Sequence, residues 1–177
     1  AGIVKIAIEH KLPIDLSKII DELSSNYNNL DKKLVLEFFN ERLFKIFEVN
    51  PTVLKAVIAS GETDIYKISQ KICALNPIVQ SDNFKEYVTT FKRVANIIKD
   101  VNITNILNIA STLLEDKEEK ELFAKYSEVS SKVYENYEDE LEALFALKPQ
   151  LDNFFDNVFV NHENEAIKNN RKNLIGM

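Results

Sequence analysis

The sequence predicts an all-α protein, and two observations lead to this fold class. Its 177 residues include three glycines and four prolines, whereas an all-β chain of this length needs many more turn residues. Apolar residues recur at spacings of three and four along most of the chain, which is the period of a helix face. With 45% hydrophobic and 28% charged residues, the chain has the composition of an ordinary folded protein.

The N-terminal elements are predicted to be helices opened by polar capping residues. Residues 3–9 and 16–23 form two short helices, with Asp15 or Ser17 as the N-cap of the second. Asp31 then opens a strongly amphipathic helix. One stripe of this helix, at spacings of three and four, consists of Val35, Phe38, Phe39, Arg42, Leu43, Ile46 and Phe47.

Proline and glycine punctuate the next two predicted helices. Asn50 is the expected N-cap of a helix that has Pro51 at its first position, and Gly61 is a natural stop. Residues 64–75 form the following helix. It is expected to end before Pro77, because a residue preceding proline is biased away from helical backbone.

The C-terminal half is predicted to continue as helices. Ser81 or Asp82 caps a helix with Phe84, Val88, Phe91, Val94, Ala95 and Ile98 on one face. Residues 102–114 are apolar and rich in Asn. Residues 115–137 predict one long acidic helix, whose inner stripe is Leu122, Phe123, Tyr126, Val129, Val133 and Tyr137. Three shorter helices follow, at residues 141–147, 151–160 and 163–175. The expected aromatic core residues are Phe38, Phe39, Phe47, Phe91, Phe123, Tyr126, Phe154 and Phe155.

The sequence contains no recognisable catalytic or metal-binding constellation. Three scattered glycines leave no phosphate-binding loop or dinucleotide fingerprint. His10 and His162 stand at opposite ends without a second ligand at metal spacing, so we expect surface or capping roles for them. Cys73 falls on an apolar stripe, which favours buried packing, and as a lone cysteine it forms no intrachain disulfide.

Charge is unevenly distributed along the chain. The net charge is −6, and residues 115–142 alone carry eleven acids and four lysines, a net of −7, so the remainder carries +1. The run at residues 115–121 predicts a solvated helix face with i,i+4 pairs, with an acidic metal cluster as the alternative. No apolar run approaches the ~18 residues of a membrane span. The chain opens in apolar-periodic sequence without an initiator Met, so we expect a piece of a larger, intracellular protein.

Two groups of basic residues are candidates for contacts with nucleic acid. Lys92 and Arg93 lie mid-helix beside Asn96, and Lys168, Arg171 and Lys172 share one face of the terminal helix by their i, i+3 and i+4 spacing. Such faces can hold phosphates or present Asn and Arg to base edges. The alternative is that they are exposed solubilising charges, or that Arg171 caps a neighbouring helix.

Several segments resemble the β subunit of bacterial glycyl-tRNA synthetase. Residues 154–160 (Phe-Phe-Asp-Asn-Val-Phe-Val) resemble its Phe-Phe-Asp-x-Val-Met-Val. Residues 165–171 with 174–175 are similar to its Leu/Ile-Arg-x-Asn-Arg-Leu, in a class named for an Asp-Ala-Leu-Arg motif that here reads Glu-Ala-Ile-Lys at 165–168. Residues 92–98 resemble Lys-Arg-Val-x-Asn-Ile-Leu, and residues 36–43 its Phe-x-x-x-Arg-Leu helix. Residues 53–57 and 2–6 extend the similarity, in order, over nearly the whole chain.

This resemblance implies a helical anticodon-binding fold and a role in recognising tRNA. It implies an N-terminal helical segment at 1–77, linked to the rest of the β subunit, and an anticodon-binding-like bundle at 78–177. The RNA-binding candidates are Lys92, Arg93, Asn96, Lys168, Asn170, Arg171 and Lys172. In the family a separate α subunit houses the aminoacylation site. ATP and Mg are therefore expected only there, and this fragment is expected to be non-catalytic and free of cofactors.

The implied partners are glycine-specific tRNA, the α subunit and the remainder of the β subunit, in the cytoplasm and with no membrane. A scaffold role, holding subunits or domains of the synthetase together, is the alternative. A contiguous basic groove bordered by Lys92, Arg93, Lys168 and Arg171 favours RNA, whereas a large exposed apolar patch favours a protein partner. The chain departs from the family at Lys168, which replaces an arginine, and at residues 161–164, which replace a more acidic connection.

Overall fold

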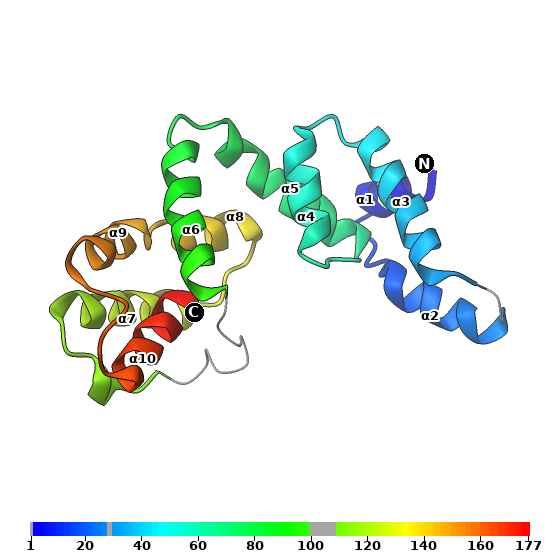
Figure 1. The fold of residues 1–177 in the computed structure, drawn as a ribbon. Helices are drawn as coiled ribbons and strands as arrows, with labels where there is room; N and C mark the ends of the chain where they lie inside the picture. Colours follow the sequence, from blue (N-terminus) through cyan, green and yellow to red (C-terminus); the bar gives the residue numbers. More distant parts are fainter. Residues whose placement is uncertain (1, 28–29, 100–108) are drawn as a thin grey trace. The chain divides into compact units, whose positions relative to one another are not determined.

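The computed structural model describes residues 2–27, 30–99 and 109–177, and its regular elements there are helices (Figure 1). The one exception in these ranges is an isolated bridge between Asp15 and Asp64. The all-α prediction is therefore confirmed. No helix in the described part of the chain has the length and apolar character needed to cross a membrane.

The chain divides into two compact units. The first comprises the residues up to Ser81 together with Asn136–Glu138, and the second comprises Asp82–Glu135 and Asp139–Met177. The sequence-based division at residue 77 stays a prediction. The two units are described separately.

The first unit is built from five helices that pack in pairs. They are α1 (Gly2–Glu9), α2 (Leu16–Asn26), α3 (Lys32–Ile46), α4 (Pro51–Ala59) and α5 (Ile65–Gln80). Helix α4 lies against α5 and α3, α1 lies against α5, and α2 lies against α3. The core between them contains Val4, Ala7, Leu16, Ile20, Leu43, Val53, Leu54, Val57, Ile65, Ile68 and Ile72.

The helix starts of this unit confirm the capping predictions. Asp15 Oδ1 accepts hydrogen bonds from the backbone N–H groups of Ser17 at 3.0 Å and Lys18 at 3.3 Å. Asp31 and Asn50 cap α3 and α4 in the same way, and Pro51 occupies the first turn of α4. Gly61 follows α4 with a φ of +79°, a left-handed conformation that favours glycine.

Three predictions for the first unit are wrong. Helix α5 continues through Pro77 to Gln80, because Leu75 and Val79 pack against the core on either side of the proline. Cys73 is exposed, since it lies about 100° around the helix from buried Ile72. Phe38 is 51% exposed, with the Arg42 guanidinium 3.9 Å from its ring centroid.

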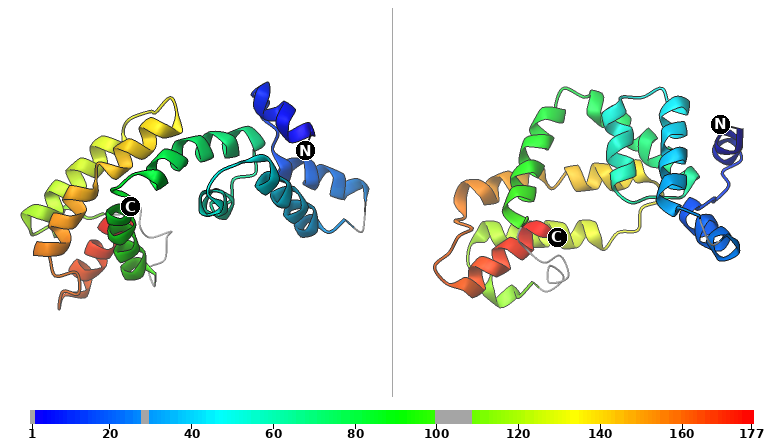
Figure 2. Two further views of the ribbon diagram at one scale, coloured as in Figure 1. Left: turned by 90° about the horizontal axis from the view of Figure 1, so that it is seen from above. Right: turned by 45° about the vertical axis from the view of Figure 1, so that its right-hand side comes forward.

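The second unit packs four longer helices with one short one. They are α6 (Phe84–Ile98), α7 (Lys117–Ser130), α8 (Tyr137–Phe145, from Asp139 on), α9 (Lys148–Asn157) and α10 (Glu165–Gly176). Helices α7 and α9 lie side by side, as both views of Figure 2 show, and α10 packs on α6 and α7. Phe154 and Phe155 are buried as predicted, and Phe91, Phe123 and Tyr126 are partly buried against the same core.

Other boundaries in the second unit differ from the predictions. The predicted helix 115–137 is interrupted after Ser130, and Val133 is 97% exposed. The hydroxyl of Ser131 donates to Glu128 O and that of Tyr134 to Val129 O, which satisfies carbonyls left free at the helix end. The predicted caps of α6, Ser81 and Asp82, are replaced by Asn83, which makes no side-chain capping bond.

The remaining elements begin or end near their predicted positions. Helix α9 starts three residues early because Pro149 sits in its first turn, where proline is tolerated. Asn164 caps α10, its side chain accepting from Ala166 N at 2.9 Å. Of the predicted stretch 102–114, residues 102–108 lie outside the described residues, and a 3₁₀ turn occupies Ser111–Leu113.

Candidate nucleic-acid-binding surface

Helix α6 is fixed to α9 by polar contacts along one of its sides. The Thr90 hydroxyl donates to Asp152 Oδ1 at 2.7 Å, and Lys148 forms an ion pair with the same carboxylate. Arg93 donates from Nη2 to Phe155 O at 3.3 Å, and its guanidinium lies 4.2 Å from the Phe155 ring centroid. These contacts determine which face of α6 remains turned to solvent.

The Asp152 carboxylate is held in its charged form by its neighbours. Burial alone would raise its pKa, but the hydrogen bonds from Lys148 and Thr90, with the charges of Lys148 and Arg93, lower the pKa below its ordinary value of 3.8. The contact between α6 and α9 thus depends on an ionised acid.

Two of the predicted RNA-binding residues on α6 are exposed and one is engaged. Lys92 and Asn96 are exposed, and Lys92 has no ion pair within the described ranges. Arg93 is exposed at its edge, but its guanidinium is occupied by Phe155. Lys92 and Asn96 therefore offer free polar groups to a ligand, whereas Arg93 holds the helix in place.

Arg171 on α10 is buried in an ion-pair network, and only 3% of its surface is exposed. Its Nε donates to Glu119 Oε1 at 2.9 Å, and its Nη2 donates to Asp116 Oδ2 at 2.7 Å. Its Nη1 donates to Phe159 O at 2.9 Å. The guanidinium therefore joins α10 to the start of α7 and to the loop before α10.

Glu119, the partner of Arg171, is fully buried at 0% exposure. Its Oε2 accepts from the backbone N–H groups of Glu115 at 2.8 Å and Asp116 at 2.7 Å, which completes a capping box at the start of α7. The prediction that residues 115–121 form a solvated face is wrong for Glu119. It holds for Lys117 and Glu121, which form an exposed i,i+4 pair at 3.3 Å.

Asn170 is buried beside Arg171, with 4% of its surface exposed. Its side-chain amide bonds twice to the backbone of Ala110: Oδ1 accepts from Ala110 N at 2.9 Å and Nδ2 donates to Ala110 O at 3.1 Å. The oxygen and the nitrogen of the amide are both bonded inside the protein, so Asn170 fixes the backbone of Ala110, just before the 3₁₀ turn.

Lys168 and Lys172 lie at the edge of α10 and are partly exposed. The Lys168 ammonium is 2.8 Å from Glu165 Oε1. The hydrogen bond from Lys168, together with the positive charge of Lys168, lowers the pKa of Glu165. The predicted basic face of α10 is thus divided. Arg171 points inward, and the charge of Lys168 is partly balanced.

The histidines occupy the roles expected of them. His10 is exposed, and His162 Nδ1 accepts a hydrogen bond from Asn164 N at 3.0 Å in the loop before α10. Among the described residues, no group of three His, Cys, Asp or Glu side chains is arranged to hold a metal ion.

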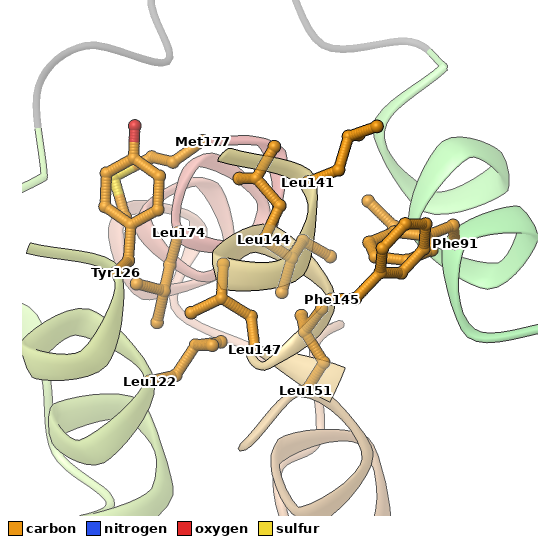
Figure 3. Close-up of a pocket in the computed structure, with 12 residues that line it drawn as sticks. Phe91, Leu122, Tyr126, Leu141, Leu144, Phe145, Leu147, Leu151, Leu174 and Met177 are labelled. Atoms are coloured by element: carbon orange, nitrogen blue, oxygen red, sulfur yellow. The ribbon is translucent and has the colours of Figure 1, made fainter. Parts of the chain in front are cut away.

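An apolar cavity of about 260 Å³, partly open to solvent, lies between the helices of the second unit. Figure 3 shows Phe91 of α6, Tyr126 of α7 and Leu144 of α8 around it, with Leu151 of α9 and Leu174 of α10. Leu122, Leu151 and Leu174 are buried, whereas Leu144 is 37% exposed at the rim. The Tyr126 hydroxyl is the polar group among the lining side chains.

Sequence comparison identifies known proteins to which this chain is similar. The chain is 30% identical over 181 residues to the glycine–tRNA ligase beta subunit of Helicobacter pylori strain G27, covering 98% of this chain and 26% of that protein. The chain is homologous to part of glycine–tRNA ligase beta subunits. The beta subunits of Sulfurihydrogenibium sp. strain YO3AOP1 and Clostridioides difficile strain 630 are each 32% identical to it, over 183 and 188 residues.

These beta-subunit matches cover 98% of this chain but only 25% and 27% of the last two relatives. The chain therefore spans about a quarter of the length of the beta subunits it matches. No protein-family model matches it. The resemblance to the beta subunit is confirmed, and the anticodon-binding subtype stays a prediction.

Proposed function

We propose that this chain binds the anticodon arm of glycine tRNA and so contributes to aminoacylation by a glycine–tRNA ligase. The observation that supports this most is the similarity of 98% of the chain to proteins named as beta subunits of that ligase. The active site, with its ATP and Mg, would lie on a separate α subunit. The chain itself would be a non-catalytic, cytoplasmic module that works with the α subunit and the remainder of the β subunit.

The geometry divides the proposed RNA-binding residues into two roles. Lys92 and Asn96 on α6, with Lys168 and Lys172 on α10, would contact RNA, because their polar groups reach solvent. Arg93, Asn170 and Arg171 would hold the RNA-contacting helices in position and would not touch RNA themselves, since each bonds to a backbone carbonyl or a carboxylate of the protein. The segment Glu-Ala-Ile-Lys at 165–168 lies in the first turn of α10, with Ile167 buried and Glu165 and Ala166 exposed.

A fluorescence anisotropy titration tests this proposal. The chain is titrated against labelled glycine tRNA and a non-cognate tRNA across a series of salt concentrations. We expect tighter binding to glycine tRNA and an affinity that falls linearly with the logarithm of salt concentration. Equal affinity for both tRNAs, or no binding at low salt by a folded chain, would contradict it.

The exposed apolar residues of the first unit support scaffolding as a second candidate. Ile3 and Ile6 on α1 are 64% and 53% exposed, and Leu34 and Phe38 on α3 are 62% and 51% exposed. Groups of exposed large apolar side chains are common at protein interfaces. Sedimentation with purified α subunit tests this, and a complex that forms without RNA but is lost in Leu34→Ser with Phe38→Ser would favour scaffolding.

A further inference from the structure

The exposed side of α6 carries a straight row of polar side chains. Lys85, Thr89, Lys92, Asn96 and Lys99 are all exposed and recur at spacings of three and four, so they lie on one stripe of the helix. Lys99 is the C-cap residue, in helical backbone conformation. At 1.5 Å rise per residue, Lys85 and Lys99 lie ~21 Å apart along the axis.

The charge of this segment is opposite to that of the whole protein. Residues 84–99 carry four basic residues and one acid, a net of +3, in a chain of net charge −6. The acid, Glu86, lies on the side of α6 that faces α9, with its carboxylate 3.8 Å from Lys148. None of Lys85, Lys92 and Lys99 forms an ion pair with the residues that the structure describes.

The position of Lys85 is not explained by helix stability. It lies in the first turn of α6, where the helix dipole disfavours a positive charge. The nearest carboxylates in sequence, Asp82 and Glu86, form no ion pair with Lys85, and Glu86 lies toward Lys148 instead. An external anion at this position would compensate for the unfavourable placement of the charge.

The stripe contains no aromatic side chain. Tyr87 and Phe91 of α6 point inward, with ring centroids 4.6 Å and 5.5 Å from that of Phe145. Proteins that bind unpaired nucleotides stack the bases on exposed aromatic rings, whereas double-stranded RNA is bound through its phosphates and 2′-hydroxyls. Lysines alternating with a threonine and an asparagine suit the second task.

We propose that the stripe Lys85–Thr89–Lys92–Asn96–Lys99 binds the sugar-phosphate backbone of double-helical RNA. This proposal rests on the proposed function of tRNA binding, and it specifies which part of the RNA is contacted by helix α6. Helix α6 would hold the paired stem of the anticodon arm, with Lys85 and Lys99 as phosphate-binding residues at either end. Thr89 and Asn96 would hydrogen-bond to phosphate or ribose oxygens between them.

Single and triple substitutions test the stripe. Lys85→Gln, Lys92→Gln and Lys99→Gln are compared with Lys117→Gln, which removes an exposed lysine, paired with Glu121, from α7 of the same unit. The affinity for glycine tRNA is measured across a salt series. Each stripe variant is expected to reduce the slope of log affinity against log salt by about 1, and the triple variant by about 3, while Lys117→Gln leaves it unchanged. The triple Lys→Arg variant is expected to retain binding, because it keeps the charges.

Competition experiments identify the RNA form. A 16-base-pair RNA duplex of mixed sequence should displace labelled glycine tRNA more effectively than poly(U) of equal nucleotide content. A wild-type slope in the triple Gln variant, with its thermal unfolding unchanged, would overturn the stripe and leave the proposed function standing. Stronger competition by poly(U) would also overturn it. A wild-type chain that binds no tRNA would overturn both.

Discussion

Arg171 and Glu119 are 52 residues apart in sequence and form a buried ion pair, with Nε 2.9 Å from Oε1. Neither side chain has more than 3% of its surface exposed. The other polar atoms of the two side chains are also bonded: the second oxygen of Glu119 accepts from two backbone N–H groups, and the guanidinium also bonds to Asp116 and Phe159. Breaking such a pair costs far more than its net contribution to stability, because one buried charge is left unpaired.

Arg171→Ala is therefore expected to lower the free energy of unfolding of the second unit by about 3–5 kcal/mol. Urea denaturation, followed by circular dichroism, measures this loss. The double variant Arg171→Met with Glu119→Gln is expected to recover much of it, because no unpaired charge remains buried and the amide oxygen can still accept from the backbone N–H groups of Glu115 and Asp116. A loss below about 1 kcal/mol in Arg171→Ala, the size expected of an exposed pair, would contradict this account.

Arg93→Gln and Lys92→Gln are expected to change different properties, although the two residues are adjacent: the first should lower stability and the second should weaken the salt dependence of tRNA binding. Arg93→Gln removes the cation–π contact with Phe155, which contributes about 0.5–1 kcal/mol at an exposed site, and should lower stability with little change in the salt dependence of tRNA binding. Lys92→Gln should leave the melting temperature unchanged and reduce the slope of binding against salt. Thermal unfolding and fluorescence anisotropy are measured on both variants. A reduced salt slope in Arg93→Gln with a lower melting temperature in Lys92→Gln would contradict the two assignments.

The contact of Asp152 with Thr90 and Lys148 should give stability a specific pH dependence. The pKa of Asp152 is lower in the folded protein than its ordinary 3.8, so its contribution is fully present above that value and is lost as the pH falls through the folded pKa. The difference in unfolding free energy between wild type and Asp152→Asn should therefore be largest near neutral pH and should shrink below about pH 4. A difference that grows on acidification would contradict the assignment.

The apolar cavity should accept a small apolar molecule. Its volume of about 260 Å³ exceeds the ~150 Å³ of an engineered apolar cavity that binds benzene. Saturating benzene is expected to raise the melting temperature of the second unit, because it binds the folded state alone. Leu144→Trp, at the rim, should abolish this shift, whereas Leu34→Trp in the first unit should preserve it. An unchanged melting temperature in wild type would contradict the binding of benzene in this cavity.

Features set by local chemistry were predicted well from the sequence. Asp15, Asp31 and Asn50 cap helices because each side chain needs only the backbone two or three residues ahead. The wrong predictions involve distant contacts. Pro77 stays inside α5 because the core of the first unit holds Leu75 and Val79, and no local signal reports that core.

The candidate site follows the same rule. Spacing alone puts Arg171 on one face with Lys168 and Lys172, but it does not tell which side of that face meets α7. A usable signal existed in Asp116 and Glu119, whose spacing is that of a capping box and which implies that Glu119 turns back toward the chain. A buried Glu119 carboxylate is unfavourable unless a cation pairs with it, and Arg171 is that cation.

The Arg171–Glu119 pair also bears on how the protein is made. Synthesis proceeds from the N-terminus, so Glu119 leaves the ribosome long before the arginine that neutralises it. The first unit draws its core from residues 4–79 and can close early. The second unit cannot bury Glu119 favourably until α10 has emerged, so we expect it to fold late, with α7 held open until Arg171 arrives. A ribosome stalled between Glu119 and Arg171 would carry a folded first unit beside an unfinished second one.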